Sequence, residues 1–483
     1  MYNWLPLNSP DDFQQLKNHI SVEYAPKTVA DRLKQDFSSS VKAVLIEHRY
    51  VDKDYRSTFY HFYAKKGQRY RSDCVRLHFF DAEVNYDPAQ LRLACADGRI
   101  DDHYFGYMVL RPTGIGTIGR SIISPDVRKG VDGFVVVAKH KVHLLGYRLT
   151  IDGFPSMDQH VDISVCAHTA CWSILRHYSE RYNIYREFHV HDITLMAQPY
   201  NPGGLVPSNG LTLSHAERVF QEAGTFPVQI ARNNEHDVAF YAQLIAYVES
   251  GFPLFAAMHK RAHAIAVVGF QWNDSSASSV SGPRYSWDAV DSLVVVDDNH
   301  FPYLSIPSSS GSPYSAKDID GFIVALPEKI FYPADAVDRL ARTLYKLNTL
   351  VKLPDNDQVI IRYFVTTGSA LRTFMRKHAS EFDPNLIMAA MTLPLAQFTW
   401  IIEYASPQEW AVGQISARAV VDATASLRDD TPLWFFHNRE RALLFERKTV
   451  GAVHEGLGAL ELQGMAATAL SRMTQNLRKT SRK

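Results

Sequence analysis

The segment that begins at Cys166 constrains this chain more than any other. Apolar residues recur at steps of three and four from Cys171 to Tyr182, the period of one buried helix face, so we predict a helix that starts at Cys166. The backbone N–H groups of a first helical turn have no partner within the helix and stabilise a nearby anion such as a thiolate. Free cysteine is also among the most buried residue types, so this helix alone leaves a nucleophile and a core residue both open.

Two apolar segments farther along the chain bring a histidine and two acids together. Segments 262–272 and 285–298 are joined by a Ser- and Gly-rich loop, and we predict an antiparallel hairpin. The start of its first strand faces the end of its second, so His263 would lie beside Asp297 and Asp298, where a carboxylate can orient the imidazole. One strand position separates the two acids and turns their side chains to opposite faces. Alignment of the strand ends favours Asp298, with Asp297 a close second.

Composition argues against several other classes of protein. Lys plus Arg (51) equals Asp plus Glu (51), which removes the broad electrostatic argument for nucleic acid or an anionic membrane as partner. The four cysteines contain no Cys-x-x-Cys pair and are too few for a disulfide framework in 483 residues, so a reducing compartment fits better. The first residues lack the basic and apolar segments of a secretion signal. We therefore expect a cytoplasmic protein without a membrane span.

The pattern divides the chain into three regions of an α+β protein. Residues 1–150 are β-rich and of no recognised role, residues 151–330 contain the helix and hairpin, and residues 331–483 are α+β with a basic tail that we expect to be a solvated helix end. In the first region, Arg111-Pro-Thr-Gly-Ile-Gly-Thr-Ile-Gly119 invites a phosphate-loop interpretation. It lacks the Lys-Ser/Thr of such loops, so a glycine-rich turn after the strand ending at Leu110 is favoured.

Gln159, Cys166, His263 and the acid pair Asp297/Asp298 follow one another in that chain order. The segments that carry them resemble the papain-like cysteine peptidases, specifically the bacteriocin-leader-peptidase-like (double-glycine-leader peptidase) branch. That family has a Gln, a short loop and Cys-Gly-x-Ala-Ala-Leu, and this chain has Gln159 and then Cys166-Ala-His-Thr-Ala-Cys. His263-Ala-Ile-Ala-Val-Val-Gly-Phe is similar to its His-x-x-Val-Val-x-Gly-Tyr, and Leu293-Val-Val-Val-Asp-Asp to its Val-x-Val-x-Asp-Pro. The resemblance covers about residues 150–330.

The chain departs from the family pattern at three places. Gln159 lies seven residues before Cys166 where the family usually has six, Ala167 replaces Gly, and Asn299 replaces the Pro after the acid. Cys171-Trp172-Ser173 is also similar to the Cys-Trp-Ala of plant and lysosomal papain-like enzymes, which makes Cys171 a rival nucleophile. We prefer Cys166, because Cys171 lies on the apolar helix face, where burial raises the pKa of a thiol.

The resemblance implies a papain-like core, with Cys166 on a helix and His263 and the acid on an antiparallel sheet. It implies a thiol-dependent hydrolase of peptide, isopeptide or amide bonds, in which Asp298 orients His263, His263 serves as the base for Cys166, and Gln159 with the Cys166 N–H binds the oxyanion. The substrate would be a peptide or protein, and no metal or organic cofactor is required. Two alternatives share this fold: an acyltransferase or transglutaminase-like enzyme with the same triad, and a catalytically silent interaction protein.

Overall fold

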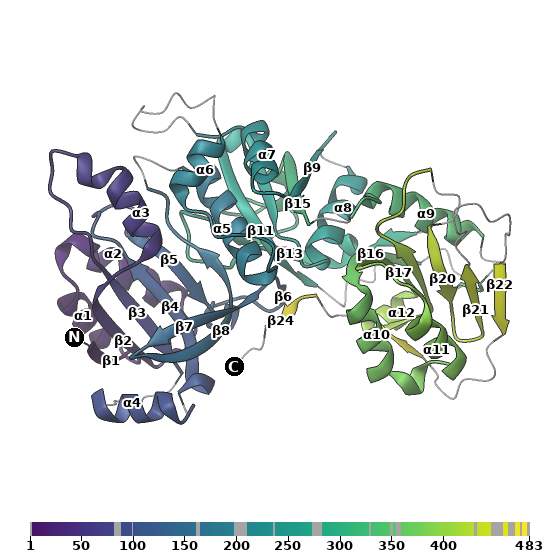
Figure 1. Ribbon diagram of the computed structural model, residues 1–483, viewed down its shortest axis with the longest axis horizontal. Helices are drawn as coiled ribbons and strands as arrows, with labels where there is room; N and C mark the ends of the chain where they lie inside the picture. Colours follow the sequence, from purple (N-terminus) through teal and green to yellow (C-terminus); the bar gives the residue numbers. More distant parts are fainter. Residues whose placement is uncertain are drawn as a thin grey trace.

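The protein is an α+β fold with three large sheets that follow one another along the long axis of the molecule (Figure 1). The computed structural model describes residues 2–81, 88–98, 100–160, 165–197, 210–234, 237–272, 283–327, 330–347, 351–353, 359–428, 432–445, 457–461, 469–473 and 476–480. This described part of the chain contains no helix with the length and hydrophobicity that a bilayer span requires.

The first sheet is seven-stranded and antiparallel, in the order β1-β2-β3-β4-β5-β8-β7. Its strands are β1 Tyr2–Pro6, β2 Ala43–Tyr50, β3 Cys74–Phe80, β4 Tyr104–Leu110, β5 Ile118–Ile123, β7 Ala138–Leu144 and β8 Tyr147–Ser156. Helices α1 Pro10–His19 and α2 Pro26–Asp36 pack on one face, and α3 Lys53–His61 packs on the other, while α4 Pro88–Ala96 follows β3. Strand β8 belongs to this sheet and runs through residue 150. The glycine-rich residues 111–117 form the turn between β4 and β5, as expected.

The central sheet is antiparallel and carries the predicted hairpin. Its main path is β14-β13-β11-β10-β15-β9, and β6 joins it from the first region. The strands are β6 Phe134–Val135, β9 Phe226–Ala231, β10 Leu254–Met258, β11 His263–Trp272, β13 Val290–Val296, β14 Leu304–Pro307 and β15 Gly321–Leu326. Pairing of β11 with β13 confirms the antiparallel arrangement, although the connecting residues 273–282 lie outside the described part.

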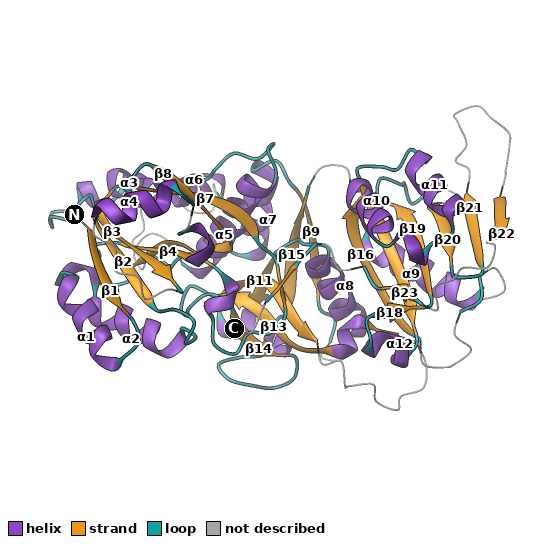
Figure 2. Cartoon of the chain, turned by 90° about the horizontal axis from the view of Figure 1, so that it is seen from below, coloured by secondary structure: helices purple, strands orange, loops and turns teal. Residues whose placement is uncertain are grey.

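Both faces of the central sheet are covered by helices. Helices α5 Cys166–Arg181, α6 Val190–Met196 and α7 Leu213–Glu222 precede β9, and α8 Val238–Glu249 leads into β10. Side chains alternate along a strand, so Ala266 and Val268 of β11 pack with α5, whereas Ile265 and Val267 pack with α8. Helix α8 lies between the central and the C-terminal sheet (Figure 2).

The C-terminal sheet has the order β12-β16-β17-β19-β20-β21-β22, and a two-stranded sheet pairs β18 with β23. Its elements are β12 Arg284–Tyr285, α9 Ala334–Lys346, β16 Ile360–Thr367, α10 Gly368–Lys377, α11 Pro384–Thr392, β17 Phe398–Ala405, α12 Pro407–Ala411, β18 Gln414–Ile415, β19 Ala417–Asp422, β20 Leu433–His437, β21 Arg441–Phe445, β22 Leu457–Glu461 and β23 Leu470–Ser471.

The prediction of a helical, solvated tail is wrong. Residues Arg478–Lys479 form the short strand β24, which pairs with β6 of the first region. Arg478 also forms an ion pair with Asp126 at 2.5 Å, and Gly133 donates its N–H to Thr480 Oγ1 at 2.8 Å. Arg478 therefore pairs with an acid, and the 478–480 backbone with a strand, far away in the sequence, which a local charge pattern could not indicate.

Candidate functional site

Cys166 is the first residue of α5, as predicted, and differs from the other three cysteines in exposure. Cys74, Cys95 and Cys171 are buried, whereas Cys166 is partly exposed. The residue before it, Val165, is extended and has no side-chain acceptor with which to cap the helix. The N–H groups of the first turn are therefore not capped by that side chain, and the Cys166 N–H has no carbonyl partner within the helix.

Cys171 lies inside the protein on the same helix. It is fully buried with Ile174 and Leu175 against the central sheet, and this burial raises the pKa of its thiol well above the ordinary value. A thiol held in its neutral form and out of contact with solvent is a poor nucleophile. The structure thus distinguishes the two cysteines by exposure.

The helix is buried more completely than its sequence period indicates. Residues Ala167 to Tyr178 are all buried, including Trp172, Arg176 and His177 on the face expected to meet solvent. The first region of the chain covers that face, so that α5 lies between the first and central sheets (Figure 1).

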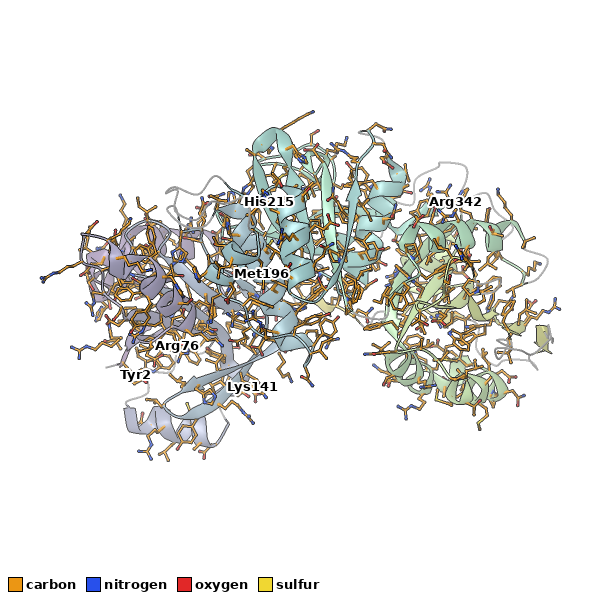
Figure 3. All side chains as sticks on the ribbon, turned by 45° about the horizontal axis from the view of Figure 1, so that its top comes forward. Tyr2, Arg76, Lys141, Met196, His215 and Arg342 are labelled. Atoms are coloured by element: carbon orange, nitrogen blue, oxygen red, sulfur yellow. The ribbon has the colours of Figure 1, made fainter. Side chains whose placement is uncertain are left out.

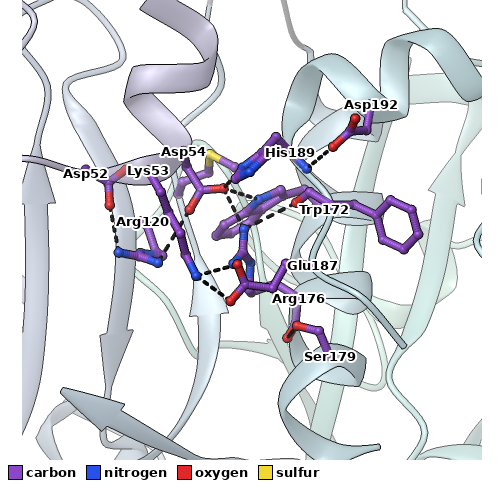
Figure 4. Close-up of polar contacts among 12 residues, drawn as sticks. Asp52, Lys53, Asp54, Arg120, Trp172, Arg176, Ser179, Glu187, His189 and Asp192 are labelled. Atoms are coloured by element: carbon purple, nitrogen blue, oxygen red, sulfur yellow. Dashed lines mark hydrogen bonds and ion pairs between the residues drawn. The ribbon is translucent and has the colours of Figure 1, made fainter. Parts of the chain in front are cut away.

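The buried carboxylate of Asp54, on α3, forms hydrogen bonds that link α5 to the first region (Figure 4). Asp54 Oδ1 accepts hydrogen bonds from Trp172 Nε1 at 3.1 Å, Arg176 Nη2 at 2.6 Å and His189 Nδ1 at 3.0 Å. Burial opposes the charge of Asp54, but Arg176, His189 and Arg120 outweigh it and hold its pKa below the ordinary value. The helix that carries Cys166 is therefore fixed to α3 by a paired, ionised acid.

His263 begins β11 and meets the acids at the end of β13. Val296, the last residue of β13, pairs with Ala266, so the two following residues lie beside the start of β11. Asp297 Oδ1 is 3.0 Å from His263 Nε2, whereas Asp298 Oδ1 is 4.0 Å away. The hairpin brings the histidine and the acids together as the sequence predicted.

Of the two acids, Asp297 makes the hydrogen bond, whereas the alignment of the strand ends favoured Asp298. The alignment assumed a regular ladder, but the register of β11 against β13 shifts between Val267 and Gly269. In addition, β13 ends at Val296, so both acids stand on non-strand backbone where strict alternation no longer applies. Such an irregularity has no signature in the strand residues themselves.

Asp297 is surrounded by donors. Tyr314 donates its hydroxyl to Oδ2 at 2.5 Å, and the Asn299 N–H donates to Oδ1 at 2.9 Å. Burial would raise the pKa of Asp297, but the bonds from His263, Tyr314 and Asn299 outweigh it and hold the pKa below its usual range. Asp297 is therefore ionised and fixed in place. Tyr314 was not identified from the sequence, and Asn299 was noted only as a departure from the family's Pro and not as a donor to the acid.

The pKa values of His263 and Asp298 are both raised, but for different reasons. Burial would lower the pKa of His263, but hydrogen bonds to Asp297 and to Cys166 outweigh it and raise the pKa to about 10. Burial and then the neighbouring Asp297 carboxylate raise the pKa of Asp298 to about 8. Near neutral pH the site thus contains an imidazolium, one ionised acid and one protonated acid.

Cys166 lies close enough to His263 to contribute to the raised pKa of its imidazole. Because Nε2 of that ring faces Asp297, Nδ1 is the nitrogen left for the sulfur. The contacts therefore run from Cys166 through His263 to Asp297, the order of nucleophile, base and orienting group.

Gln159 follows β8 and is partly exposed, and residues 161–164 between it and the helix lie outside the described part. Its segment is fixed by the glycine-rich turn. Arg111 donates Nη2 to the Asp158 carbonyl at 2.9 Å, and the Asp158 N–H donates to the Ile118 carbonyl at 2.8 Å. Gly116 has φ +58°, and a Cβ there would lie 2.2 Å from the Gln159 carbonyl, so only glycine fits.

His263, Asp297 and Asp298 also form a group that could hold a metal ion. Their ligand atoms lie within 4.8 Å of one another. One imidazole nitrogen with carboxylate oxygens suits a divalent cation such as Zn²⁺. The arrangement is therefore compatible with two kinds of chemistry, and the contact with Cys166 is the feature specific to thiol chemistry.

A separate cavity of about 430 Å³ adjoins the first sheet, and Tyr2, Arg76 and Lys141 line it (Figure 3). Arg176 also lines it, ten residues after Cys166, so the cavity lies about 15 Å along α5 from the thiol. Arg76 is paired with Glu47 at 2.7 Å and Arg176 with Asp54 at 2.6 Å. Both of these guanidinium groups are thus already paired with carboxylates of the protein.

Comparison with known proteins gives no match: no protein-family model fits the sequence, and no curated protein is significantly similar to it.

Proposed function

We propose that this protein is a thiol-dependent hydrolase of peptide, isopeptide or amide bonds, built on a papain-like core with Cys166 as nucleophile. The observation that carries the proposal is the hydrogen bond from His263 to the buried Asp297, with the partly exposed Cys166 near enough to His263 to help raise the pKa of the imidazole. It combines a partly exposed thiol at an uncapped helix start with an imidazole whose second nitrogen faces a buried carboxylate. These are the groups that acyl transfer through a thioester needs.

The reaction follows from the positions of the groups. His263 holds the proton of Cys166, and the thiolate attacks the carbonyl carbon of the scissile bond. The Cys166 N–H and the Gln159 amide donate hydrogen bonds to the resulting oxyanion. As the C–N bond breaks, His263 Nδ1 gives its proton to the leaving amine and a thioester remains. Water then attacks the thioester, His263 takes a proton from that water, and the acid product leaves with Cys166 restored as thiolate.

Alkylation by iodoacetamide tests the nucleophile without a known substrate. Wild type, Cys166→Ala, Cys171→Ala and His263→Ala are labelled near neutral pH, and modified residues are identified by mass spectrometry. We expect rapid labelling at Cys166, loss of it in Cys166→Ala, strong slowing in His263→Ala and no change in Cys171→Ala. Labelling that moves to Cys171, or that ignores His263, contradicts the proposal.

A metal-dependent hydrolase is the second candidate, because His263, Asp297 and Asp298 could hold a cation. In that enzyme the acids would be ligands, so added Zn²⁺ would slow alkylation and EDTA would abolish turnover. Under the thiol mechanism EDTA leaves labelling unchanged.

An acyltransferase would use the same thioester and transfer the acyl group to an amine. Once a substrate is found, adding a primary amine such as methylamine and measuring the ratio of amide to acid product separates the two enzymes. Equal and slow labelling of all four cysteines would instead favour the catalytically silent interaction protein.

A further inference from the structure

Two segments that meet at the proposed site come from distant parts of the chain. Asp158 and Gln159 follow β8, and Asp297 to Asn299 follow β13. Arg32, on α2 of the first region, contacts both. Its Nη1 donates to Asp158 Oδ1 at 2.8 Å, and its Nη2 donates to the Asn299 carbonyl at 3.3 Å. One guanidinium therefore bridges the residue before Gln159 and the residue whose N–H holds Asp297.

The Arg32 guanidinium also supplies positive charge near three buried acids. Asp158, Asp297 and Asp298 are all buried, at 9%, 3% and 5% exposure. Burial raises the pKa of Asp158, and Arg32 and then Arg111 oppose that rise, while Asp158 itself adds to the raised pKa of Asp298. The charge of Arg32 thus offsets the Asp158 carboxylate, which in turn acts on Asp298.

The loop after the acids is anchored in the same region of the chain. Phe301 is 2% exposed and packs in the core under α1 and α2, where its ring meets Phe37 edge-on at 5.2 Å. Tyr303 donates its hydroxyl to the Ile123 carbonyl of β5 at 2.7 Å. The loop carrying Asp297 is therefore held from the first sheet as well as from its own strand.

We infer that Arg32 is a positioning residue of the thiol site, so that the first region of the chain completes the catalytic apparatus. This inference rests on the proposed thiol chemistry. Arg32 contacts neither the thiol nor the imidazole in any described interaction. It acts by fixing the Asn299 backbone, which fixes Asp297, and by fixing Asp158, which sets the position of Gln159.

Loss of the bridge predicts a change in pH dependence as well as in rate. A loosened Asp297 stabilises the His263 imidazolium less, so a thiolate has a weaker counter-charge beside it and we expect the alkylation rate to rise only at higher pH. General damage to the fold would lower the alkylation rate at all pH values alike. Other titratable or charged groups of the described residues also lie around His263 and Asp297. They include Asp298, His300, Tyr314, Asp158 and Arg111.

The test is the rate of Cys166 alkylation by iodoacetamide from pH 5 to pH 10 in the full-length chain. The variants are Arg32→Ala, Arg32→Lys, Asp158→Asn and the pair Arg32→Ala with Asp158→Asn. Arg339→Ala is the matched control, because Arg339 is an exposed arginine paired with Asp335 on α9. Urea unfolding of each variant shows whether the fold survives.

We expect Arg32→Ala to slow alkylation at pH 7 by about 10- to 100-fold, the effect of a small misplacement of reacting groups, and to move the rate profile to higher pH. Arg32→Lys retains the charge but lacks the two-armed fork, so its rate should lie between the two. Because Arg32 acts partly through Asp158, the double variant should be less impaired than the product of the single effects.

A folded Arg32→Ala variant with a rate within twofold of wild type and an unmoved profile would overturn the inference. If that variant does not fold, an unchanged profile in both Arg32→Lys and Asp158→Asn would overturn it equally. A wild-type Cys166 that reacts independently of His263 is a different result, since it refutes the proposed chemistry and with it the role of Arg32.

Discussion

Replacing each of the two neighbouring acids by its amide separates their roles. Asp297 lies 3.0 Å from His263 Nε2 and makes a hydrogen bond, whereas Asp298 lies 4.0 Å away and accepts a hydrogen bond from Asn299 Nδ2 at 3.4 Å. A hydrogen bond to a charged group contributes about 1.5–3 kcal/mol, which corresponds to a factor of about 10–150 in rate. We therefore expect Asp297→Asn to slow alkylation of Cys166 at pH 7 by this factor, and Asp298→Asn to change it less than about threefold on the same scale.

The Asp297→Asn rate is expected to fall and not to rise because of the pKa of His263. Contacts that include Asp297 outweigh burial and raise this pKa to about 10. Without the carboxylate, His263 loses the hydrogen bond that raises its pKa most, so less imidazolium is present at pH 7 to stabilise a thiolate. The Asp297→Asn rate should then recover above about pH 9, where an ordinary thiol ionises unaided. Stopped-flow or quenched alkylation across pH measures this. A slower Asp298→Asn than Asp297→Asn would refute the reasoning.

Three further predictions concern stability. Cys171→Ala should leave labelling of Cys166 unchanged and lower the free energy of unfolding by about 1–2 kcal/mol, because it opens a small cavity in a packed core. Urea unfolding with parallel labelling measures both effects. Loss of labelling in this variant would contradict the assignment of Cys166 as nucleophile. Asp54→Ala leaves Arg176 buried without its closest carboxylate contact, so the free energy of unfolding measured in urea should fall by about 3–5 kcal/mol. A fall of less than about 1 kcal/mol would mean that the Asp54 contacts do not stabilise the packing of α5 against α3. The pKa of Asp298 is raised to about 8, so the folded state keeps a proton that the unfolded chain releases above its ordinary pKa, and stability falls as pH rises toward 8. Asp298→Asn removes this loss and should be more stable than wild type by about 1–3 kcal/mol at pH 8 and nearly equal to it at pH 4; equal stability at both pH values would show that Asp298 does not titrate in this way.

Local sequence patterns predicted the elements that carry the site. The helix begins at Cys166, and strands β11 and β13 lie within the two hairpin segments that composition indicated. These segments could be predicted because their apolar residues repeat at the spacing of the structure that they form. The hairpin was predictable for a related reason, since antiparallel pairing relates its two ends by simple arithmetic.

Contacts between distant segments could not be predicted in the same way. The charged residues Arg32, Asp54 and Arg176 look like ordinary surface positions in the sequence, yet Asp54 and Arg176 are buried against each other and Arg32 bridges two loops. No local pattern indicates which acid an arginine will meet more than a hundred residues away.

The sequence by itself determined that a cysteine would begin a helix and that a histidine and two acids would share one end of a hairpin. Only the tertiary structure decided that Cys166 is partly exposed, and that Asp297 rather than Asp298 accepts the hydrogen bond from His263. The physical reason is that periodicity reports which face of an element is apolar. Exposure and hydrogen-bond distance depend on what packs against that element, and here the covering surface comes from α2, α3 and the glycine-rich turn of the first region.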